Sequence, residues 1–350
     1  MSTADIRPPD VRLAVDAMGG DGGPPVVVQG LNEAARLHPT AHFLLFGDPA
    51  VLAPHLEAHP RLTSQVTVRE AASTVPSGLK PRNALRADYE RSSLALTLEA
   101  VANGEASACI SAADTGAMMA LGMRHLGLFS GIDRPAVASY VPTLRNETVV
   151  LDLGANLSVA GKNLLQFGIL GTALSETMLA IPEPRVGLLN IGSEETKGPA
   201  HIQDAHELMR AHAWAGSYMG FVEPNDLIHG KMDVMVCDGY AGNIFLKSTE
   251  ATAALVGGYT QATFNESWLS RLGLIFAARQ FAKLRQRIDP RRYNGAVMAG
   301  LANVCVKSHG GADPISFANA LELAIDMVNG GYTRRVPELL ETELQQSTSR

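Results

Sequence analysis

Short apolar runs recur along the chain, separated by longer stretches in which apolar residues follow a helical spacing. Most of these runs are continuously apolar, which is the pattern of strands buried on both faces of a parallel sheet. The predicted strands are 12–17, 42–47, 107–112, 147–154, 185–192 and 231–239. The predicted helices between them include 88–103, 115–126 and 161–180. This alternation predicts an α/β fold with helices on both faces of the sheet.

Several predicted strands end at or next to a short polar side chain, and glycine follows within a few residues. These side chains belong to Asp16, Ser111, Asp152, Asn190 and Asp238. In open parallel sheets, ligands bind beyond the carboxyl ends of the strands. We therefore expect the five loops to form one shared cleft.

Glycine-rich loops of this kind suit an anion. Glycine allows backbone N–H groups to turn toward a ligand, and a following helix N-terminus adds partial positive charge. The stretch "VDAMGGDGGPP" (15–25) places four glycines after the first strand, and its prolines would start the next helix. Thr115 and Gly116 open a second such helix, and Asn243 lies near the start of a third. One such loop alone is as readily a tight turn.

Composition limits the class of protein. The chain has 350 residues, 46% of them hydrophobic and 18% charged, which is ordinary for a globular protein with a large core. A net charge of -6 argues against a nucleic-acid binder. No apolar run is long enough to span a membrane, and residues 1–10 lack a signal-peptide core. The three cysteines lie far apart in sequence, so we expect a cytoplasmic protein without disulfides or a metal cluster.

The chain carries no standard cofactor or hydrolase motif. It has no GxGxxG after a strand, no GxxxxGK[ST] and no GxSxG, and its His, Cys and Asp residues lack metal-ligand spacing. Cys237 is a candidate nucleophile, but no basic neighbour would lower its pKa, which favours a buried, inert thiol. Lys197 in "SEETKG" and His309 in "KSHGGADP" are either anion-binding groups or solvated surface residues.

Seven segments in a fixed order carry a resemblance to a known family. They are "LAVDAMGGDGGP", "ACISAADTGAMMA", "GIDRPAVASYVPT", "LDLGAN", "RVGLLNIGSEETKG", "DVMVCDGYAGNIFLK" and "VKSHGGAD", between about residues 13 and 313. As a set they resemble the phosphate acyltransferase family, the acyl-carrier-protein:phosphate transacylases of bacterial phospholipid synthesis.

The resemblance implies a fold, a reaction and partners. The fold would be Rossmann-like, related to phosphotransacetylases and isocitrate dehydrogenase, with a protruding helical hairpin. The enzyme would convert long-chain acyl-[acyl carrier protein] and inorganic phosphate into acyl phosphate without a cofactor. A glycerol-3-phosphate acyltransferase would then use the product. The resemblance also implies a homodimer that is peripherally membrane-associated. We expect a flexible tail at 1–10, the α/β domain at 11–331 with a protruding amphipathic segment at 264–292, and a C-terminal helix and polar tail at 332–350.

The same resemblance assigns catalysis to Lys197 and Asn243, which match the family's motifs. Lys197 would neutralise phosphate and a developing oxyanion, and Asn243 would donate a hydrogen bond to either. The thiol leaving group, with a pKa of about 8.5, needs no strong acid. The residues expected to contact substrate or phosphate are Gly19, Gly20, Asp21, Arg86, Ser111, Thr115, Gly116, Asn156, Glu194, Asp238, Gly242 and His309. Asp16 and Asp21 are expected to brace loop backbone or Lys197, because carboxylates repel phosphate.

Three stretches depart from the family's usual pattern. "SAADTGA" has Ala113 and Asp114 where glycine and asparagine are usual, and a carboxylate beside phosphate must be paired or face away. Asp88 and Glu90 lie in a stretch that is typically more basic, and Ser158 replaces a common aspartate.

Residues 271–292 are strongly basic in an otherwise acidic chain. Asp289 is the one acid there, against Arg271, Arg279, Lys283, Arg285, Arg287, Arg291 and Arg292. An apolar stripe at helical spacing accompanies them. The stripe either packs on the body or a dimer partner, or the basic face docks the acidic carrier protein, or the segment enters a membrane surface. The resemblance favours the membrane. The contact residues would then be Trp268, Leu269, Leu272, Ile275, Phe276, Arg279 and Lys283.

Two rival functions stay open at this point. A β-decarboxylating dehydrogenase of related fold would need clustered aspartates for a metal and would depend on NAD. A non-catalytic membrane adaptor for the glycerol-phosphate acyltransferase would tolerate loss of Lys197.

Replacing Leu272 and Ile275 together by Glu should abolish binding to anionic liposomes, because charged side chains are unfavourable where an apolar face enters the bilayer surface. Liposome co-sedimentation measures this. Unchanged binding by the double variant would refute the membrane hypothesis.

Overall fold

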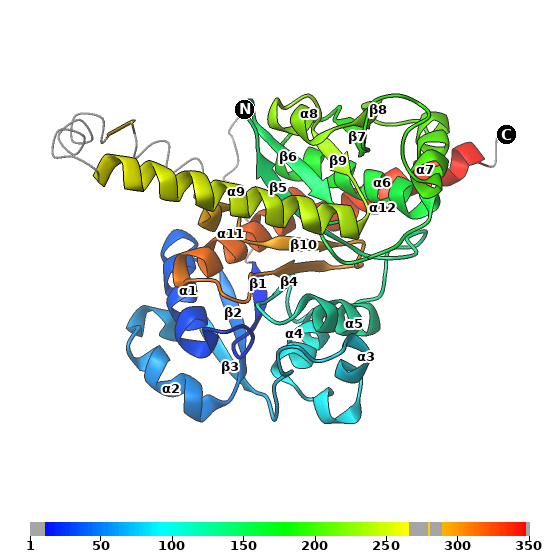
Figure 1. Ribbon diagram of the computed structural model, residues 1–350. Coiled ribbons are helices and arrows are strands. Elements are labelled where there is room, and N and C mark those ends of the chain that lie inside the picture. Colours follow the sequence, from blue (N-terminus) through cyan, green and yellow to red (C-terminus); the bar gives the residue numbers. More distant parts are fainter. Residues whose placement is uncertain (1–10, 266–278, 281–288, 348–350) are drawn as a thin grey trace, which may run out of the picture.

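The computed structural model describes residues 11–265, 279–280 and 289–347, which are built around one eleven-stranded sheet (Figure 1). Across the sheet the strand order is β3-β2-β1-β4-β11-β10-β5-β6-β9-β7-β8. The strands are β1 (Arg12–Asp16), β2 (His42–Gly47), β3 (Val66–Glu70), β4 (Ala108–Ser111), β5 (Ala136–Pro142), β6 (Glu147–Leu151), β7 (Arg185–Leu189), β8 (Ser217–Val222), β9 (Val234–Val236), β10 (Ala296–Ala299) and β11 (Val304–Lys307).

Each of the six predicted strands is present, and most are shorter than predicted. The apolar pattern missed β3, β5, β8, β10 and β11. β3 and β8 are the outermost strands of the sheet and are partly exposed, while β10 and β11 have only four residues each. The predicted helix at 88–103 begins only at Ser93, because the Ser92 side chain accepts a hydrogen bond from Ala95 N–H and caps it.

Helices cover both faces of the sheet. Because successive residues of a strand face opposite sides, Leu13 and Ala14 belong to separate apolar clusters, one on each face. One face carries α1 (Gly23–Leu37), α2 (Pro49–Glu57), α6 (Gly161–Met178), α7 (Ala200–Ala211), α11 (Pro314–Gly330) and α12 (Tyr332–Ser347). The other carries α3 (Pro81–Ala84), α4 (Ser93–Ala102), α5 (Thr115–His125), α8 (Pro224–Ile228) and the start of α9 (Gly239–Asn265). The predicted Rossmann-like α/β class is confirmed.

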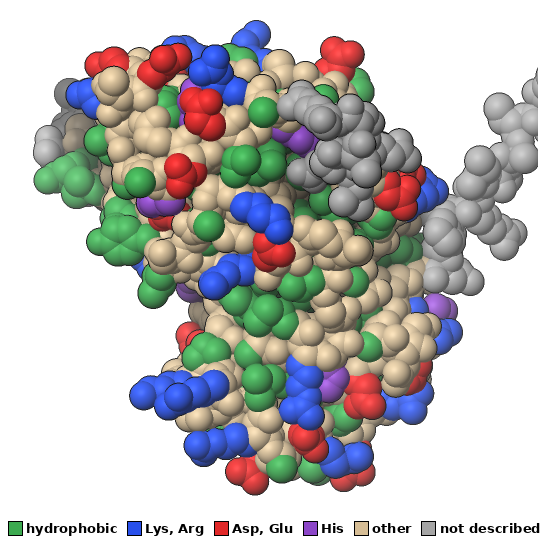
Figure 2. Space-filling view, turned by 90° about the vertical axis from the view of Figure 1, so that its right-hand side faces the viewer, with side chains coloured by type: hydrophobic (Ala, Val, Ile, Leu, Met, Phe, Trp, Pro, Cys, Tyr) green, Lys and Arg blue, Asp and Glu red, His purple; other side chains and the backbone are tan. Residues whose placement is uncertain are grey.

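Strand direction reverses in the middle of the sheet. β1, β4 and β11 are parallel, β10 is antiparallel to both β11 and β5, and β5 is antiparallel to β6. β6, β9 and β7 are parallel to one another. They point opposite to β1, because three successive antiparallel pairings separate β11 from β6. The prediction of one shared cleft is therefore wrong, because the strand-end loops lie at opposite ends of the strands. The loops after β1, β4 and β11 form one edge of the sheet, and the loops after β6, β7 and β9 form the opposite edge. In side view the molecule narrows between its two halves (Figure 2).

At one edge, Asp16 organises the loop after β1. Its carboxylate is 1% exposed and accepts hydrogen bonds from Ser111 Oγ at 2.6 Å and Met18 N–H at 3.1 Å. Ser111 Oγ in turn accepts from Ala113 N–H at 3.0 Å. A Cβ on Gly19 would lie 2.7 Å from Asp16 Oδ2, so only glycine fits there. The expectation that Asp16 braces loop backbone is confirmed.

At the other edge, Asp152 organises the loop after β6. Its side chain is 0% exposed. Oδ1 accepts from the N–H groups of Val137, Gly154 and Ala155 at 2.8–3.1 Å. Oδ2 accepts from Asn156 N–H at 2.7 Å and Asn156 Nδ2 at 2.9 Å. Burial raises the pKa of Asp152, and these hydrogen bonds oppose the rise.

Replacing Asp152 by Asn should lower the free energy of unfolding by about 2–3 kcal/mol, because an NH2 group would face N–H donors and leave them unpaired in the core. Urea unfolding at neutral pH measures this.

Asp16→Asn is the matched control. Its amide would still accept from Met18 and donate to Ser111 Oγ, so we expect a smaller loss, on the order of 1 kcal/mol. Equal losses would contradict the distinction between the two buried aspartates.

Candidate functional site

The edge formed by β1, β4 and β11 gathers one group of predicted site residues. It brings together the loops that carry Gly19, Gly20, Asp21, Ser111, Thr115, Gly116 and His309. Asp21 N–H donates to Gly310 O at 2.8 Å. Gly20 has φ +82°, and a Cβ there would lie 3.0 Å from the same carbonyl oxygen. The glycines thus allow close packing of two loops. Asp21 cannot brace Lys197, which lies at the opposite edge.

Asp114, the unexpected carboxylate, is paired. It accepts a hydrogen bond from Gly78 N–H just before α5. Its negative charge also acts on Lys307, a residue that the sequence interpretation passed over. Lys307 is in register with Ser111, and its Nζ donates to Ser308 O at 2.9 Å. Burial lowers the pKa of Lys307. The sequence does carry a sign of this residue, because a lysine ends the apolar run directly before "SHGG".

The stretch 84–94 lies beside this edge. Arg86 is exposed and follows α3. Glu90 forms an ion pair with Arg124, with 2.9 Å between Oε1 and Nη2. The acidic departure at Glu90 is thus neutralised by α5. A Cβ on Gly116 would lie 2.6 Å from Pro81 Cγ, so α3 packs closely over the start of α5.

The opposite edge holds both predicted catalytic residues. Lys197 is exposed, in the loop between β7 and α7. Its carbonyl oxygen accepts from Asn190 Nδ2 at 3.0 Å and from Gln203 Nε2. Gly198 has φ +95°, and a Cβ there would collide with Asn190 Oδ1 at 2.3 Å. The "KG" pair therefore needs its glycine. Glu194 lies in the same loop, close to Gly192.

Asn243 is the fifth residue of α9, which starts directly after Asp238. The Asp238 carboxylate accepts from Ala241 N–H at 2.7 Å and lies 3.2 Å from His201 Nε2. His201 is in the first turn of α7, four residues after Lys197. Asp238 thus ties the two catalytic candidates' loops together, and both its oxygens already have protein partners.

The loop after β6 completes this edge. Gly239 N–H donates to Asn156 O at 2.9 Å. A Cβ on Gly154 would lie 3.4 Å from Asn243 Cγ, so the loop contacts the Asn243 side chain. Gly242 packs on Asp152 O, where a Cβ would lie 2.0 Å away. Lys197, Asn243, Asn156, Glu194, Asp238 and Gly242 therefore share one edge, while the remaining predicted contacts belong to the other.

Cys237 does not act as a surface nucleophile in this fold. It is 1% exposed, and its Sγ donates to Asp152 O at 3.3 Å. Burial raises the pKa of the thiol well above its usual value. The favoured interpretation of a buried, inert thiol is confirmed.

Most of the predicted membrane segment lies outside the described residues. The predicted contact residues outside them are Trp268, Leu269, Leu272, Ile275, Phe276 and Lys283. Arg279 is described and is exposed. The described part of α9 projects from the body (Figure 1), and residues 251–263 are exposed throughout.

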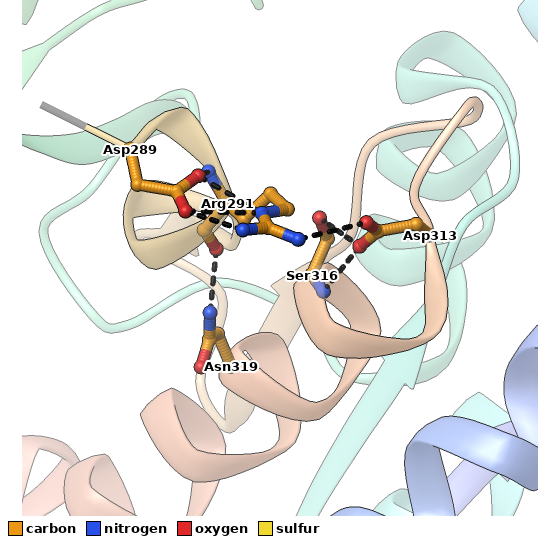
Figure 3. Close-up of polar contacts among 5 residues, drawn as sticks. All are labelled: Asp289, Arg291, Asp313, Ser316 and Asn319. Atoms are coloured by element: carbon orange, nitrogen blue, oxygen red, sulfur yellow. Dashed lines mark hydrogen bonds and ion pairs between the residues drawn. The ribbon is translucent and has the colours of Figure 1, made fainter. Parts of the chain in front are cut away.

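Arg291 is one of the basic residues of the 271–292 segment. Its contacts join this part of the chain to the N-terminal part of α11 (Figure 3). Its guanidinium lies 2.6 Å from Asp289 Oδ2 and 3.6 Å from Asp313 Oδ2. Its carbonyl oxygen accepts from Asn319 Nδ2 at 2.6 Å. Asp313 also caps α11 by accepting from Ser316 N–H at 2.8 Å. This residue is therefore an anchor to α11.

Among residues 11–265, 279–280 and 289–347, no group of three or more His, Cys, Asp or Glu side chains is placed to hold a metal. In the same ranges, no helix is both long and apolar enough to cross a bilayer.

Solved structures share the fold. The EutD phosphotransacetylase from Staphylococcus aureus superimposes with a TM-score of 0.58 at 14% identity, covering 92% of this chain and 94% of that one. A branched-chain phosphotransacylase from Enterococcus faecalis gives 0.57 at 12% identity, covering 91% and 99%. At such identities the likeness establishes the fold alone.

Sequence relatives are much closer. A phosphate acyltransferase from Rhodospirillum centenum is 47% identical over 328 residues, covering 94% of this chain and 92% of that protein. One from Rhodospirillum rubrum is 44% identical over 337 residues, covering 96% of each. The family model described as "Fatty acid synthesis protein" matches residues 11–335. The chain therefore belongs to this family, together with the phosphate acyltransferases that it resembles.

Proposed function

We propose that this phosphate acyltransferase moves a long-chain acyl group from acyl carrier protein to inorganic phosphate. A phosphate oxygen attacks the thioester carbonyl carbon, and the C–S bond breaks. The products are acyl phosphate and the free thiol of the carrier protein. The family membership supports this reaction. The geometry that carries it is the joint fixation of the Lys197 and Asn243 loops at one sheet edge through Asp238 and His201.

In this proposal Lys197 supplies the positive charge. None of the ion pairs among the described residues involves it, and its side chain is exposed, so its ammonium group is open to an anion. Asn243, at the start of α9, donates a hydrogen bond to phosphate or to the oxyanion that forms on the thioester carbonyl. The partial positive charge of the α9 N-terminus adds to this stabilisation. Because phosphate is already an anion and a thiolate leaves readily, positioning the two reactants is the main task.

The edge formed by the loops after β1, β4 and β11 is another candidate site for an anion. Lys307, the glycine loop after β1 and the N-terminus of α5 lie there. Acidic carrier protein would also need basic contacts, for which the exposed Arg86 is available.

We also propose a homodimer that contacts the membrane from the cytoplasm and hands acyl phosphate to a glycerol-3-phosphate acyltransferase. Exposed apolar side chains on α9 support an interaction surface there. Leu255 is 56% exposed, Val256 57% and Tyr259 69%. The domain limits 11–331 and 332–350 stay predictions, and α12 packs its buried Tyr332 and Val336 into the main core.

Lys197→Ala should lower kcat/KM for palmitoyl-[acyl carrier protein] at least 100-fold, because the anion loses its main positive charge. Asn243→Ala should lower it roughly 10- to 100-fold through loss of one oxyanion donor. Phosphate-dependent release of free carrier protein, with hydroxylamine trapping of acyl phosphate, measures both without metal or nucleotide.

Lys231→Ala is the control, since Lys231 is an exposed lysine that pairs with Asp226 away from the site. It should keep wild-type turnover. Full activity in Lys197→Ala would refute the assignment. A folded wild-type protein with no phosphate-dependent turnover would favour the adaptor function, and NAD-dependent turnover would favour the dehydrogenase.

A further inference from the structure

A cavity of about 570 Å3 opens between α5 and the loop that follows β6. Its lining residues are Met119, Met123, Asp133, Arg134, Pro135, Ala155, Asn156, Leu157 and Ser158. α5 comes from the first half of the sheet and the 155–158 loop from the second, so the cavity lies between the two halves. Its volume is within the range of small-molecule sites, about 300–1,000 Å3.

The wall of this cavity carries apolar side chains that the fold leaves uncovered. Leu157 is 74% exposed and Met123 is 41% exposed. Met119 and Met123 are four residues apart and so share one face of α5. Methionine adapts its shape to flexible apolar ligands. Arg134, at the same cavity, is exposed and adds a positive charge.

The loop after β6 lies between this cavity and Asn243. Asn156 lines it, and its carbonyl oxygen accepts from Gly239 N–H at the start of α9. Two residues earlier, Gly154 contacts the Asn243 side chain. One loop therefore presents Ala155 and Leu157 to the cavity and Gly154 to Asn243. Asp152 holds that loop by accepting four hydrogen bonds from its N–H groups.

We infer that this cavity receives the hydrocarbon chain of the acyl substrate, an inference that rests on the proposed function. With the thioester carbonyl beside Asn243, the chain crosses Gly154 and lies between Met119, Met123 and Leu157. Each methylene buried there is worth about fourfold in binding. The depth of the cavity then sets the preferred chain length.

Met123→Trp fills the cavity from a partly exposed position, and tests the inference. The kcat/KM for palmitoyl-[acyl carrier protein] should fall at least tenfold, while that for butanoyl-[acyl carrier protein] stays within about twofold, because roughly two buried methylenes account for a tenfold change. Met219→Trp is the matched control, a 46% exposed methionine on β8 that does not line the cavity. It should change neither value.

Equal losses with both chain lengths, or no loss with either, would overturn the inference. If thermal unfolding shows that Met123→Trp is not folded, Leu157→Trp takes its place.

A binding measurement separates this inference from the proposed reaction. Palmitate should displace a fluorescent long-chain fatty acid from the wild-type protein, with an affinity at least tenfold weaker in Met123→Trp and unchanged in Met219→Trp. This result would support the cavity even if wild-type protein showed no phosphate-dependent turnover, in which case only the proposed reaction fails. Palmitate that does not bind wild-type protein, or binds Met123→Trp equally well, overturns the cavity assignment.

Discussion

The antiparallel pairing of β5 with β6 is the constraint on which the rest of this structure depends. A tight turn joins the two strands, in which Thr143 N–H and Oγ1 both donate to Asn146 O at 2.8 and 2.7 Å. After this turn β6, β7, β8 and β9 point the other way, so the loops that follow them lie at the opposite edge from the loops of β1 and β4. β11, later in the chain, is parallel to β4 and returns to the first edge. Two separate groups of polar loops result, and α5 crosses from the first edge toward the loop of Asp152.

Both groups are organised by a buried aspartate. Asp16 and Asp152 are almost fully buried and bind mainly hydroxyl and N–H groups. Fixing loops in this way before substrate arrives reduces the entropy lost on binding and keeps donors aimed at developing charge. The glycines serve the same purpose at Gly19 and Gly242, where any side chain would collide with the aspartate or its carbonyl.

The proposed reaction uses three neighbouring parts of one edge. The Lys197 loop supplies charge, the N-terminal part of α9 supplies Asn243, and the loop after β6 separates Asn243 from an apolar cavity. The same helix α9 then extends outward with exposed Leu255 and Tyr259, and Arg291 fastens the returning chain to α11. A surface contact on α9 would thus act on the helix whose N-terminal part holds Asn243.

The sequence by itself determined the α/β class, six of the strands and the buried state of Cys237, because apolar runs and glycine-rich strand ends are local patterns. The catalytic candidates Lys197 and Asn243 came from the family resemblance of their motifs. It did not reveal β5, since that strand's partly polar run "AVASYVP" resembles no buried parallel strand. Without β5 the reversal of strand direction was invisible, and one cleft was predicted where two edges exist. The pairing of Glu90 with Arg124, the partial burial of Lys307 and the register of Cys109 beside Cys305 likewise depend on residues far apart in the chain. Only the tertiary structure decided these contacts, because strand order and direction, which no local pattern encodes, determine which distant residues meet.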